Sequence, residues 1–270
     1  EFNDSWSPHA IDEALDRVLV SRFLSGSHAG EAARLYYSVR WWTCQTNASL
    51  RNAYASLRGH LKLERGRTVD PECWEAVLLQ TEAVLNSTEI KATLQERGFA
   101  ACAFLLAFDL YWRGGDASIA RRCELRPPAQ AQRGAASAWS ITLFPESDEL
   151  SSKTGRRDVT GTVGTSHPDR SWVAKLCPIL LSASTSPMLF PLHPRRLLQL
   201  YHSSRRAARL ATSHPHRLRH GGASMDALVP GTTDLQIAER GDWAAMSSVA
   251  RYRRPAKYLR ELHRLSKMLT

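Results

Sequence analysis

The chain has 270 residues, of which 43% are hydrophobic and 23% are charged. This composition is typical of a globular protein that can bury the core of one large domain or two ordinary ones. The longest uninterrupted apolar stretch, residues 99–108, is too short to cross a bilayer, and the acidic N-terminus does not have the pattern of a signal peptide. We therefore expect an intracellular protein without membrane contact, nuclear if eukaryotic and otherwise in the cytoplasm or nucleoid.

The cysteines agree with an intracellular protein. All five are scattered singly and none has CxxC spacing: Cys44, Cys73, Cys102, Cys123 and Cys177. Such a set indicates reduced thiols and argues against a zinc site.

The net charge of +10 is concentrated in the second half of the chain. Residues 151–270 hold 20 lysines and arginines against 7 acidic residues, whereas residues 72–150 hold 7 against 11. A segment this basic predicts a polyanionic partner, and its mixture with His, Trp and Gly favours nucleic acid over a membrane surface.

The first part of the chain is predicted to be a small helical unit. Apolar residues recur at helical spacing over residues 8–25, 30–43 and 48–63, and the aromatic residues of the second helix are expected in the core. The polar segment 64–71 contains Gly and Pro and separates two apolar-periodic regions. It predicts domains at 1–66 and 72–270, joined by a linker at 67–71.

The second region begins with helices expected from Pro71 and over residues 90–98. The stretch 99–111 is apolar almost all round, which predicts a helix buried in the middle of a domain. It is followed by Arg113-Gly-Gly-Asp116. A cation at the end of a buried helix needs a partner, and the candidates are Asp116 and a bound phosphate.

After a loop at 126–137, residues 139–144 alternate in the manner of a β-strand. A hairpin is expected over 151–163 with its turn near Gly155, and Lys153 lies just before that turn. Further helices are predicted over residues 172–182, 194–210 and 255–269. The helix at 194–210 is expected to bury its leucines and to leave its arginines for solvent or a DNA backbone.

The most informative stretch begins at His214-Pro215, which predicts an entry turn into a helix. His216 and Arg219 are three residues apart, so their side chains share a face, and the small residues that follow allow close helix packing. Arg presents a fork of donors suited to a phosphate, and His moves protons near neutral pH. The pair indicates a site that grips a phosphate beside acid–base chemistry.

Two other interpretations of this stretch remain. His216 and His220 could bind a metal from one helix face, but a zinc-protease helix would have Glu where this chain has Arg217. The segment could also be a solvated basic helix.

The segment His216-x-Leu-Arg219-His220 resembles the His-x-x-Arg box of the tyrosine recombinases, the phage-integrase family. In that family a Gly-His or Gly-Trp element follows, with the nucleophilic tyrosine nine residues later. Here Trp243 and Tyr252 have that spacing, although Asp242 separates Gly241 from Trp243. Arg113 and Asp116 resemble the family's first arginine box, Arg-x-x-Glu, with Asp in place of Glu. Lys153 resembles the lysine of the family's β-hairpin.

The resemblance implies a mainly α fold with a small antiparallel β-sheet or hairpin. It implies a helical, SAM-like N-terminal core-binding domain and an integrase-like catalytic domain, which close around DNA as a clamp. The implied partners are double-stranded DNA and further copies of the chain, assembled as a tetramer, and the C-terminal helix can pack on a neighbouring protomer. The Arg-rich and Ala-rich composition of the chain also resembles that of recombinases from eukaryotic mobile elements.

The resemblance further implies DNA breaking and rejoining through a 3′-phosphotyrosyl intermediate, without metal or cofactor. The implied catalytic residues are Arg113, Lys153, His216, Arg219, Trp243 and Tyr252, with Asp116 and His220 in support. The candidate DNA-binding residues are Arg195, Arg196, Arg205, Arg206 and Arg217. Tyr258 is a rival nucleophile, but the family's spacing selects Tyr252. A relaxing enzyme like the type IB topoisomerases, an inactive DNA-binding descendant and a non-enzymatic helical DNA-binding protein remain alternatives.

Overall fold

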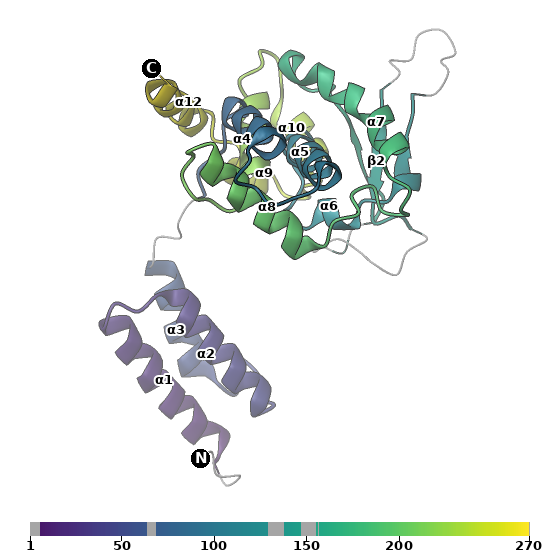
Figure 1. The fold of residues 1–270 in the computed structure, drawn as a ribbon. Coiled ribbons are helices and arrows are strands. Elements are labelled where there is room, and N and C mark those ends of the chain that lie inside the picture. Colours follow the sequence, from purple (N-terminus) through teal and green to yellow (C-terminus); the bar gives the residue numbers. More distant parts are fainter. Residues whose placement is uncertain (1–5, 64–68, 129–137, 147–154, 156, 270) are drawn as a thin grey trace. The chain divides into compact units, whose positions relative to one another are not determined.

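The computed structural model describes residues 6–63, 69–128, 138–146, 155 and 157–269. The chain divides into two compact units, Glu1–Thr68 and Val69–Thr270, which are described separately below (Figure 1). The fold is mainly α with one small antiparallel sheet, as the sequence predicted. Among the residues that the structure describes, no helix combines the length and the apolar character needed to span a bilayer.

The first unit consists of helices α1 (Pro8–Leu24), α2 (Ala29–Trp42) and α3 (Arg51–Leu63), within a few residues of the predicted bounds. Its core contains Leu15, Tyr36 and Leu57. The buried carboxylate of Asp12 accepts the main-chain N–H groups of Asn52 and Ala53 at 3.0 and 2.9 Å. A side chain of α1 therefore satisfies the free donors in the first turn of α3 and attaches the two helices to each other.

The aromatic residues of α2 are only partly in the core, which corrects the expectation for three of them. Tyr36 is buried, but Tyr37 is 48% exposed, Trp41 is 82% exposed and Trp42 is 64% exposed. The two tryptophans follow one another near the end of the helix, where the turn carries them away from the face that packs on α1 and α3.

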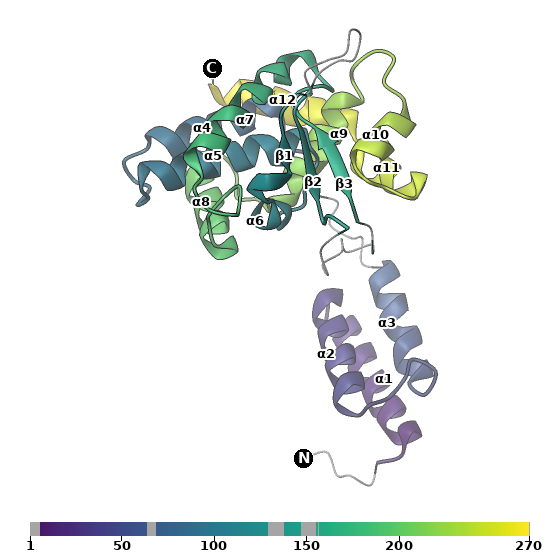
Figure 2. The ribbon, with the colours of Figure 1, turned by 90° about the vertical axis from the view of Figure 1, so that its right-hand side faces the viewer.

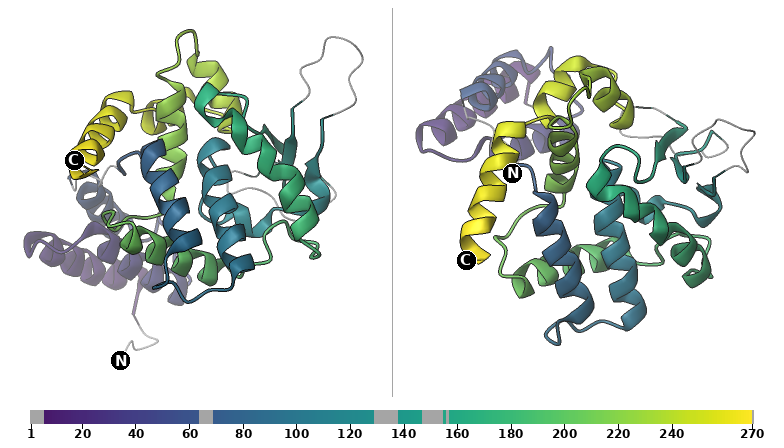
Figure 3. Two further views of the ribbon diagram at one scale, coloured as in Figure 1. Left: turned by 45° about the horizontal axis from the view of Figure 1, so that its top comes forward. Right: turned by 90° about the horizontal axis from the view of Figure 1, so that it is seen from above.

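The second unit is built around α5 (Leu94–Asp109), whose side chains are buried on almost every face from Phe99 onward. The apolar stretch predicted such a helix, and the structure confirms it. Thr93 and Glu96 form a capping box that fixes where the helix begins. Helix α4 (Trp74–Asn86) runs beside α5, as the two blue helices in both views of Figure 3 show, and α8 (Pro194–Ala207) and α9 (His216–Asp226) pack on the same pair.

The sheet contains β1 (Leu125–Arg126), β2 (Ser140–Leu143) and β3 (Val159–Thr162) in the order β1-β2-β3 (Figure 2). Both pairs are antiparallel, with Leu143 opposite Val159. The strand predicted at 139–144 is therefore present. The hairpin predicted over 151–163 is different, because its second half pairs with β2. Residues 151–154 lie outside the described part of the chain.

The remaining elements connect and cover this framework. They are α6 (Asp116–Ile119), the 3₁₀ helices η1 (Arg122–Glu124) and η2 (Pro168–Lys175), α7 (Leu176–Ala183), α10 (Asp234–Arg240), α11 (Met246–Tyr252) and α12 (Pro255–Leu269). The single helix predicted over 172–182 is thus a 3₁₀ segment followed by an α-helix.

Helix α12 packs on the unit of its own chain. The Tyr258 hydroxyl accepts the main-chain N–H of Trp74 at 3.0 Å, and Arg217 of α9 pairs with Glu261 at 2.9 Å. Its own unit covers part of the apolar side of the helix, since Tyr258 and Leu265 are buried while Leu259 is 49% exposed.

Two glycines allow α9 to lie against α5. A Cβ atom on Gly222 would lie 2.1 Å from the carbonyl oxygen of Phe108, and one on Gly221 would lie 2.2 Å from that of Glu72. Both neighbours are main-chain atoms, one in α5 and one in the buried segment that leads into α4, and neither can move aside without disturbing the packed core.

Gly222→Ala should therefore destabilise the protein by about 2 kcal/mol or more, because the added methyl group forces α9 away from α5. The measurement is urea-induced unfolding of the full chain. Gly98→Ala is the matched control, since Gly98 lies inside α5 and an added methyl group there would have no atom within 4 Å. It should be neutral or stabilising by up to about 1 kcal/mol. Equal stability of Gly222→Ala and the unchanged chain would contradict this account of the packing.

Candidate functional site

Arg219 lies on the buried side of α9 and is only 4% exposed. Its guanidinium donates to the carbonyl oxygen of Tyr111, which follows α5, and to that of Gly241 at 2.6 Å, which follows α10. Arginine has five N–H donors, so three remain after these two bonds. Among the described residues, Nε has no hydrogen-bond partner. The side chain is thus held in place by two carbonyls and keeps unused donors.

Tyr252 is the last residue of α11, and its ring is enclosed by three others. The Trp243 ring stacks on it at 4.6 Å with an interplanar angle of 7°, and the rings of His220 and His216 lie at 4.5 and 5.5 Å. Arg219 Cζ lies 5.2 Å from the centre of the Tyr252 ring. The tyrosine is therefore fixed against the same face of α9 that carries His216 and Arg219.

The main chain around Tyr252 is also held by α9. The buried hydroxyl of Ser224 donates to the carbonyl oxygen of Tyr252 at 3.2 Å and accepts the N–H of Arg254 at 2.9 Å. Ser224 therefore fixes the end of α11 from the helix that supplies the arginine.

The connection from α10 to Trp243 contains Asp242, the additional residue that separates Gly241 from Trp243. Asp242 has φ = 51°, in the left-handed region. Gly241 has no side chain, and a Cβ atom there would lie 2.7 Å from the Trp243 ring. The additional residue thus turns the chain so that Trp243 folds back over Gly241 and reaches Tyr252.

Arg113 lies beside this cluster, at the rim of a cavity of about 700 Å³ that is also lined by His216, Trp243 and Tyr252. Its main-chain N–H donates to the carboxylate of Asp116 at 2.7 Å. The predicted partnership with Asp116 therefore involves the main chain, and the guanidinium makes no hydrogen bond or ion pair with any residue that the structure describes. A cation without a partner in the described part of the chain thus lines the same cavity as the tyrosine.

Burial and neighbouring charge change the acid–base properties of the site. Burial, together with the positive charge of Arg113, lowers the pKa of Arg219 to about 10. Burial, together with His216 and Arg254, lowers the pKa of His220 to about 3. Burial also raises the pKa of Asp116. The two arginines are close enough to repel each other, a repulsion that a bound anion would relieve.

Five of the six residues expected to be catalytic thus come together: Arg113, His216, Arg219, Trp243 and Tyr252. The sixth, Lys153, lies outside the described residues. The supporting residues Asp116 and His220 are both buried beside this cluster.

The arginines expected on a DNA-binding surface do not all lie on one. Arg205 is 2% exposed and pairs with Glu72 at 2.5 Å, which corrects the prediction for this residue. Arg217 is largely buried between Glu72 and Glu261. Arg196 is partly exposed and pairs with Glu96 at 2.8 Å.

The other two are accessible. Arg195 lines the cavity and Arg206 is exposed. Arg251 is an exposed residue of the same cavity to which the sequence assigned no role, and its position directly before Tyr252 was the available signal.

No family model matches the sequence, and no curated protein matches it. Solved structures do match the fold. A lambda integrase dimer bound to a COC′ core site is 15% identical, with a TM-score of 0.58 over 90% of this chain and 64% of that one. A lambda integrase tetramer bound to a Holliday junction is 16% identical, with a TM-score of 0.54 over 90% and 64%. The XerH site-specific recombinase bound to a palindromic difH substrate is 12% identical, with a TM-score of 0.51 over 82% and 65%.

The chain thus spans just under two thirds of the length of these structures. At these identities the likeness concerns the fold alone, which this chain shares with lambda integrase and XerH.

Proposed function

We propose that this protein is a site-specific DNA recombinase that cuts and rejoins DNA through a 3′-phosphotyrosyl intermediate. One observation carries the proposal. Tyr252 is packed against His216 and Arg219 at a cavity where the Arg113 guanidinium has no partner among the described residues. A nucleophile beside two repelling cations has the chemistry of a phosphodiester site.

In this reaction the phenolic oxygen of Tyr252 attacks the scissile phosphorus. The new O–P bond forms as the bond from phosphorus to the 5′-oxygen breaks, so the phosphoryl group remains on the 3′ side and a 5′-hydroxyl is released. Attack by a free 5′-hydroxyl reverses the step and rejoins the strand. Because the phosphotyrosyl link keeps the energy of the broken bond, rejoining needs no nucleotide.

The roles of the other described residues follow from their positions, and the role of Lys153 is the one that the family resemblance implies. Arg113 and Arg219 stabilise the negative charge on the non-bridging oxygens with their remaining donors. His216 assists the departure of the phenolic proton, and Lys153 protonates the leaving 5′-oxygen. Trp243 holds the Tyr252 ring by stacking. His220 has too low a pKa to act as the base near neutral pH and acts by packing.

The assembly proposed with this chemistry is a tetramer on double-stranded DNA, with residues 1–66 as a core-binding domain and 72–270 as the catalytic domain. The basic second half of the chain supports DNA binding. The integrase and XerH structures are DNA complexes, two of them a dimer and a tetramer. The C-terminal helix that packs in cis here is the proposed element for exchange between protomers, and a eukaryotic mobile element is the proposed source.

Tyr252→Phe should abolish covalent attachment to DNA, because the substitution removes the attacking oxygen and leaves the ring. The measurement uses a suicide duplex nicked near the scissile phosphate, taken from the DNA flanking the gene, and detects a protein–DNA adduct on a denaturing gel. Tyr258→Phe is the matched control, since it removes a buried phenolic hydroxyl from the next helix and should leave the adduct unchanged.

Three results would lead to other conclusions. An adduct that survives Tyr252→Phe would exclude this tyrosine as the nucleophile, and its loss in Tyr258→Phe alone would assign the rival. Relaxation of supercoiled DNA without strand exchange between two duplexes would favour the topoisomerase-like alternative. DNA binding without any adduct would indicate an inactive descendant.

The lowered pKa of His220 predicts that the free energy of unfolding depends on pH. An ordinary histidine has a pKa of about 6.5, so unfolding takes up a proton between that pH and the folded-state pKa of about 3. The stability that the neutral imidazole contributes is complete above pH 6.5 and is lost as the pH falls towards 3. When the pH falls from 7.5 to 5, the free energy of unfolding of the unchanged chain should therefore decrease through His220. In His220→Gln this contribution is absent, so the decrease should be smaller by about 2 kcal/mol. Urea unfolding at the two pH values tests this, and equal losses would contradict it.

A further inference from the structure

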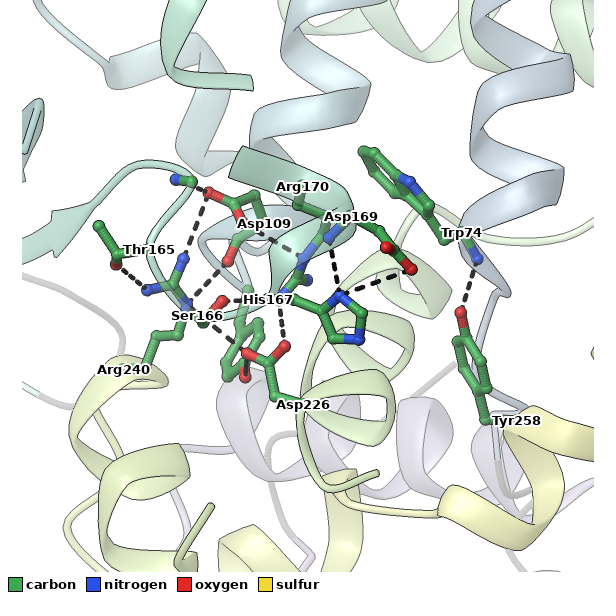
Figure 4. A network of polar contacts seen from close by, with 12 residues as sticks. Trp74, Asp109, Thr165, Ser166, His167, Asp169, Arg170, Asp226, Arg240 and Tyr258 are labelled. Carbon is green, nitrogen blue, oxygen red and sulfur yellow. Dashed lines mark hydrogen bonds and ion pairs between the residues drawn. The ribbon is translucent and has the colours of Figure 1, made fainter. Parts of the chain in front are cut away.

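Three buried charges and one partly buried charge form a closed ring next to the site, here called the charge ring: Asp109, Arg170, Asp226 and the partly buried Arg240 (Figure 4). Arg170 pairs with Asp109 at 3.5 Å and with Asp226. Arg240 pairs with the same two carboxylates at 3.2 and 3.9 Å. Each cation therefore contacts both anions, and the net charge is zero, which is how buried ions are tolerated.

The ring joins the ends of the elements that carry the site. Asp109 is the last residue of α5, Asp226 is the last residue of α9 and Arg240 is the last residue of α10. Arg219 lies on α9, and Trp243 follows α10. A displacement of any of these ends would therefore move a site residue, since α9 and the end of α10 meet through Arg219 and Gly241.

Tyr111 connects the charge ring to the site by three contacts. Its hydroxyl donates to Asp226, its carbonyl oxygen accepts from Arg219, and its ring stacks on that of Trp243 at 6.0 Å with an interplanar angle of 16°. The residue is fully buried and has φ = 51°, a conformation that residues with a side chain rarely adopt. Such a conformation persists only where the surroundings impose it, and here it allows one residue to make all three contacts.

The stack continues from Trp243 to Tyr252 at 4.6 Å. The three rings of Tyr111, Trp243 and Tyr252 thus follow one another from the charge ring to the phenol. The indole N–H of Trp243 has no hydrogen-bond partner among the described residues, so packing contacts hold its ring. Besides Tyr111, these include Arg219, whose Cζ lies 4.9 Å from the centre of the Trp243 ring and whose guanidinium is bonded to the Tyr111 carbonyl oxygen.

We propose that Tyr111, held by the charge ring, is a positioning residue for Tyr252. It sets the plane of Trp243, and thereby that of the Tyr252 ring, while its carbonyl oxygen orients Arg219 in the same site. The inference rests on the proposed function only in taking Tyr252 as the nucleophile. Tyr111 itself does not contact the DNA phosphate in this account.

The test replaces Tyr111 by Phe in the full chain, which removes the hydroxyl bond to Asp226 and keeps the ring. Tyr258→Phe is the matched control, because it removes another buried hydroxyl from the same unit. The first readout needs no activity. Tyrosines are replaced by 3-fluorotyrosine, the Tyr252 signal is assigned from its absence in Tyr252→Phe, and its ¹⁹F shift reports the ring current of Trp243.

The second readout separates positioning from binding. It compares the single-turnover rate of adduct formation on the suicide duplex with the Kd for the same DNA. Because a misplaced reacting group slows the chemical step, Tyr111→Phe should form the adduct at least about tenfold more slowly with an unchanged Kd. The Tyr252 signal should move or broaden, and Tyr258→Phe should change neither readout.

Arg240→Lys is the second variant, and it keeps a cation in the charge ring. It tests the inference if Tyr111→Phe does not fold. It should change both readouts in the same direction, since lysine lacks the fork that reaches two carboxylates. A Tyr252 signal that is unchanged in a folded variant overturns the inference, whatever the rate does. A moved signal in a protein that forms no adduct supports the inference about Tyr252 and rejects the proposed function.

Discussion

Helix α9 lies directly against α5 because Gly221 and Gly222 present no side chains to the main chain of their neighbours. Two contacts of the candidate site depend on that approach. It brings Arg219 within reach of the carbonyl oxygen of Tyr111, and it gives Ser224 access to the end of α11. With one methyl group between the helices, the arginine and the tyrosine would belong to separate surfaces.

The buried arginines of the second unit show how a strongly basic chain folds around a helical core. Arg205 is neutralised by Glu72, and Arg170 by the two carboxylates of the charge ring. Arg219 has no carboxylate at bonding distance among the described residues and uses two carbonyls instead. Its lowered pKa reflects that burial and the nearby charge of Arg113. The site therefore holds positive charge that the described part of the fold leaves uncompensated, which is the property that a DNA phosphate would use.

Stacked rings hold the side chain of the proposed nucleophile, and a hydrogen bond from Ser224 holds its main chain. Trp243 and His220 enclose the Tyr252 ring and fix its plane, and Tyr252 lines the same cavity as Arg113. This arrangement suits a phosphoryl transfer in which the protein contributes position and charge. In the proposed role of Tyr111, ring stacking also positions Trp243. Tyr111 is in turn held by its hydrogen bond to Asp226 of the charge ring.

The sequence by itself determined the helical framework and the identity of the candidate site. The all-round apolar stretch before Arg113 predicted a buried helix, because periodicity is a property of the chain alone. The preference for Tyr252 over Tyr258 came from the resemblance to the tyrosine recombinases, whose nucleophile follows the His or Trp by nine residues. The tertiary structure decided which charges are buried. Asp109 meets Arg170 and Arg240, and Glu72 meets Arg205, across separations of 61, 131 and 133 residues. No local pattern distinguishes these arginines from solvated ones such as Arg206, because an ion is buried only where a distant partner arrives to offset its desolvation.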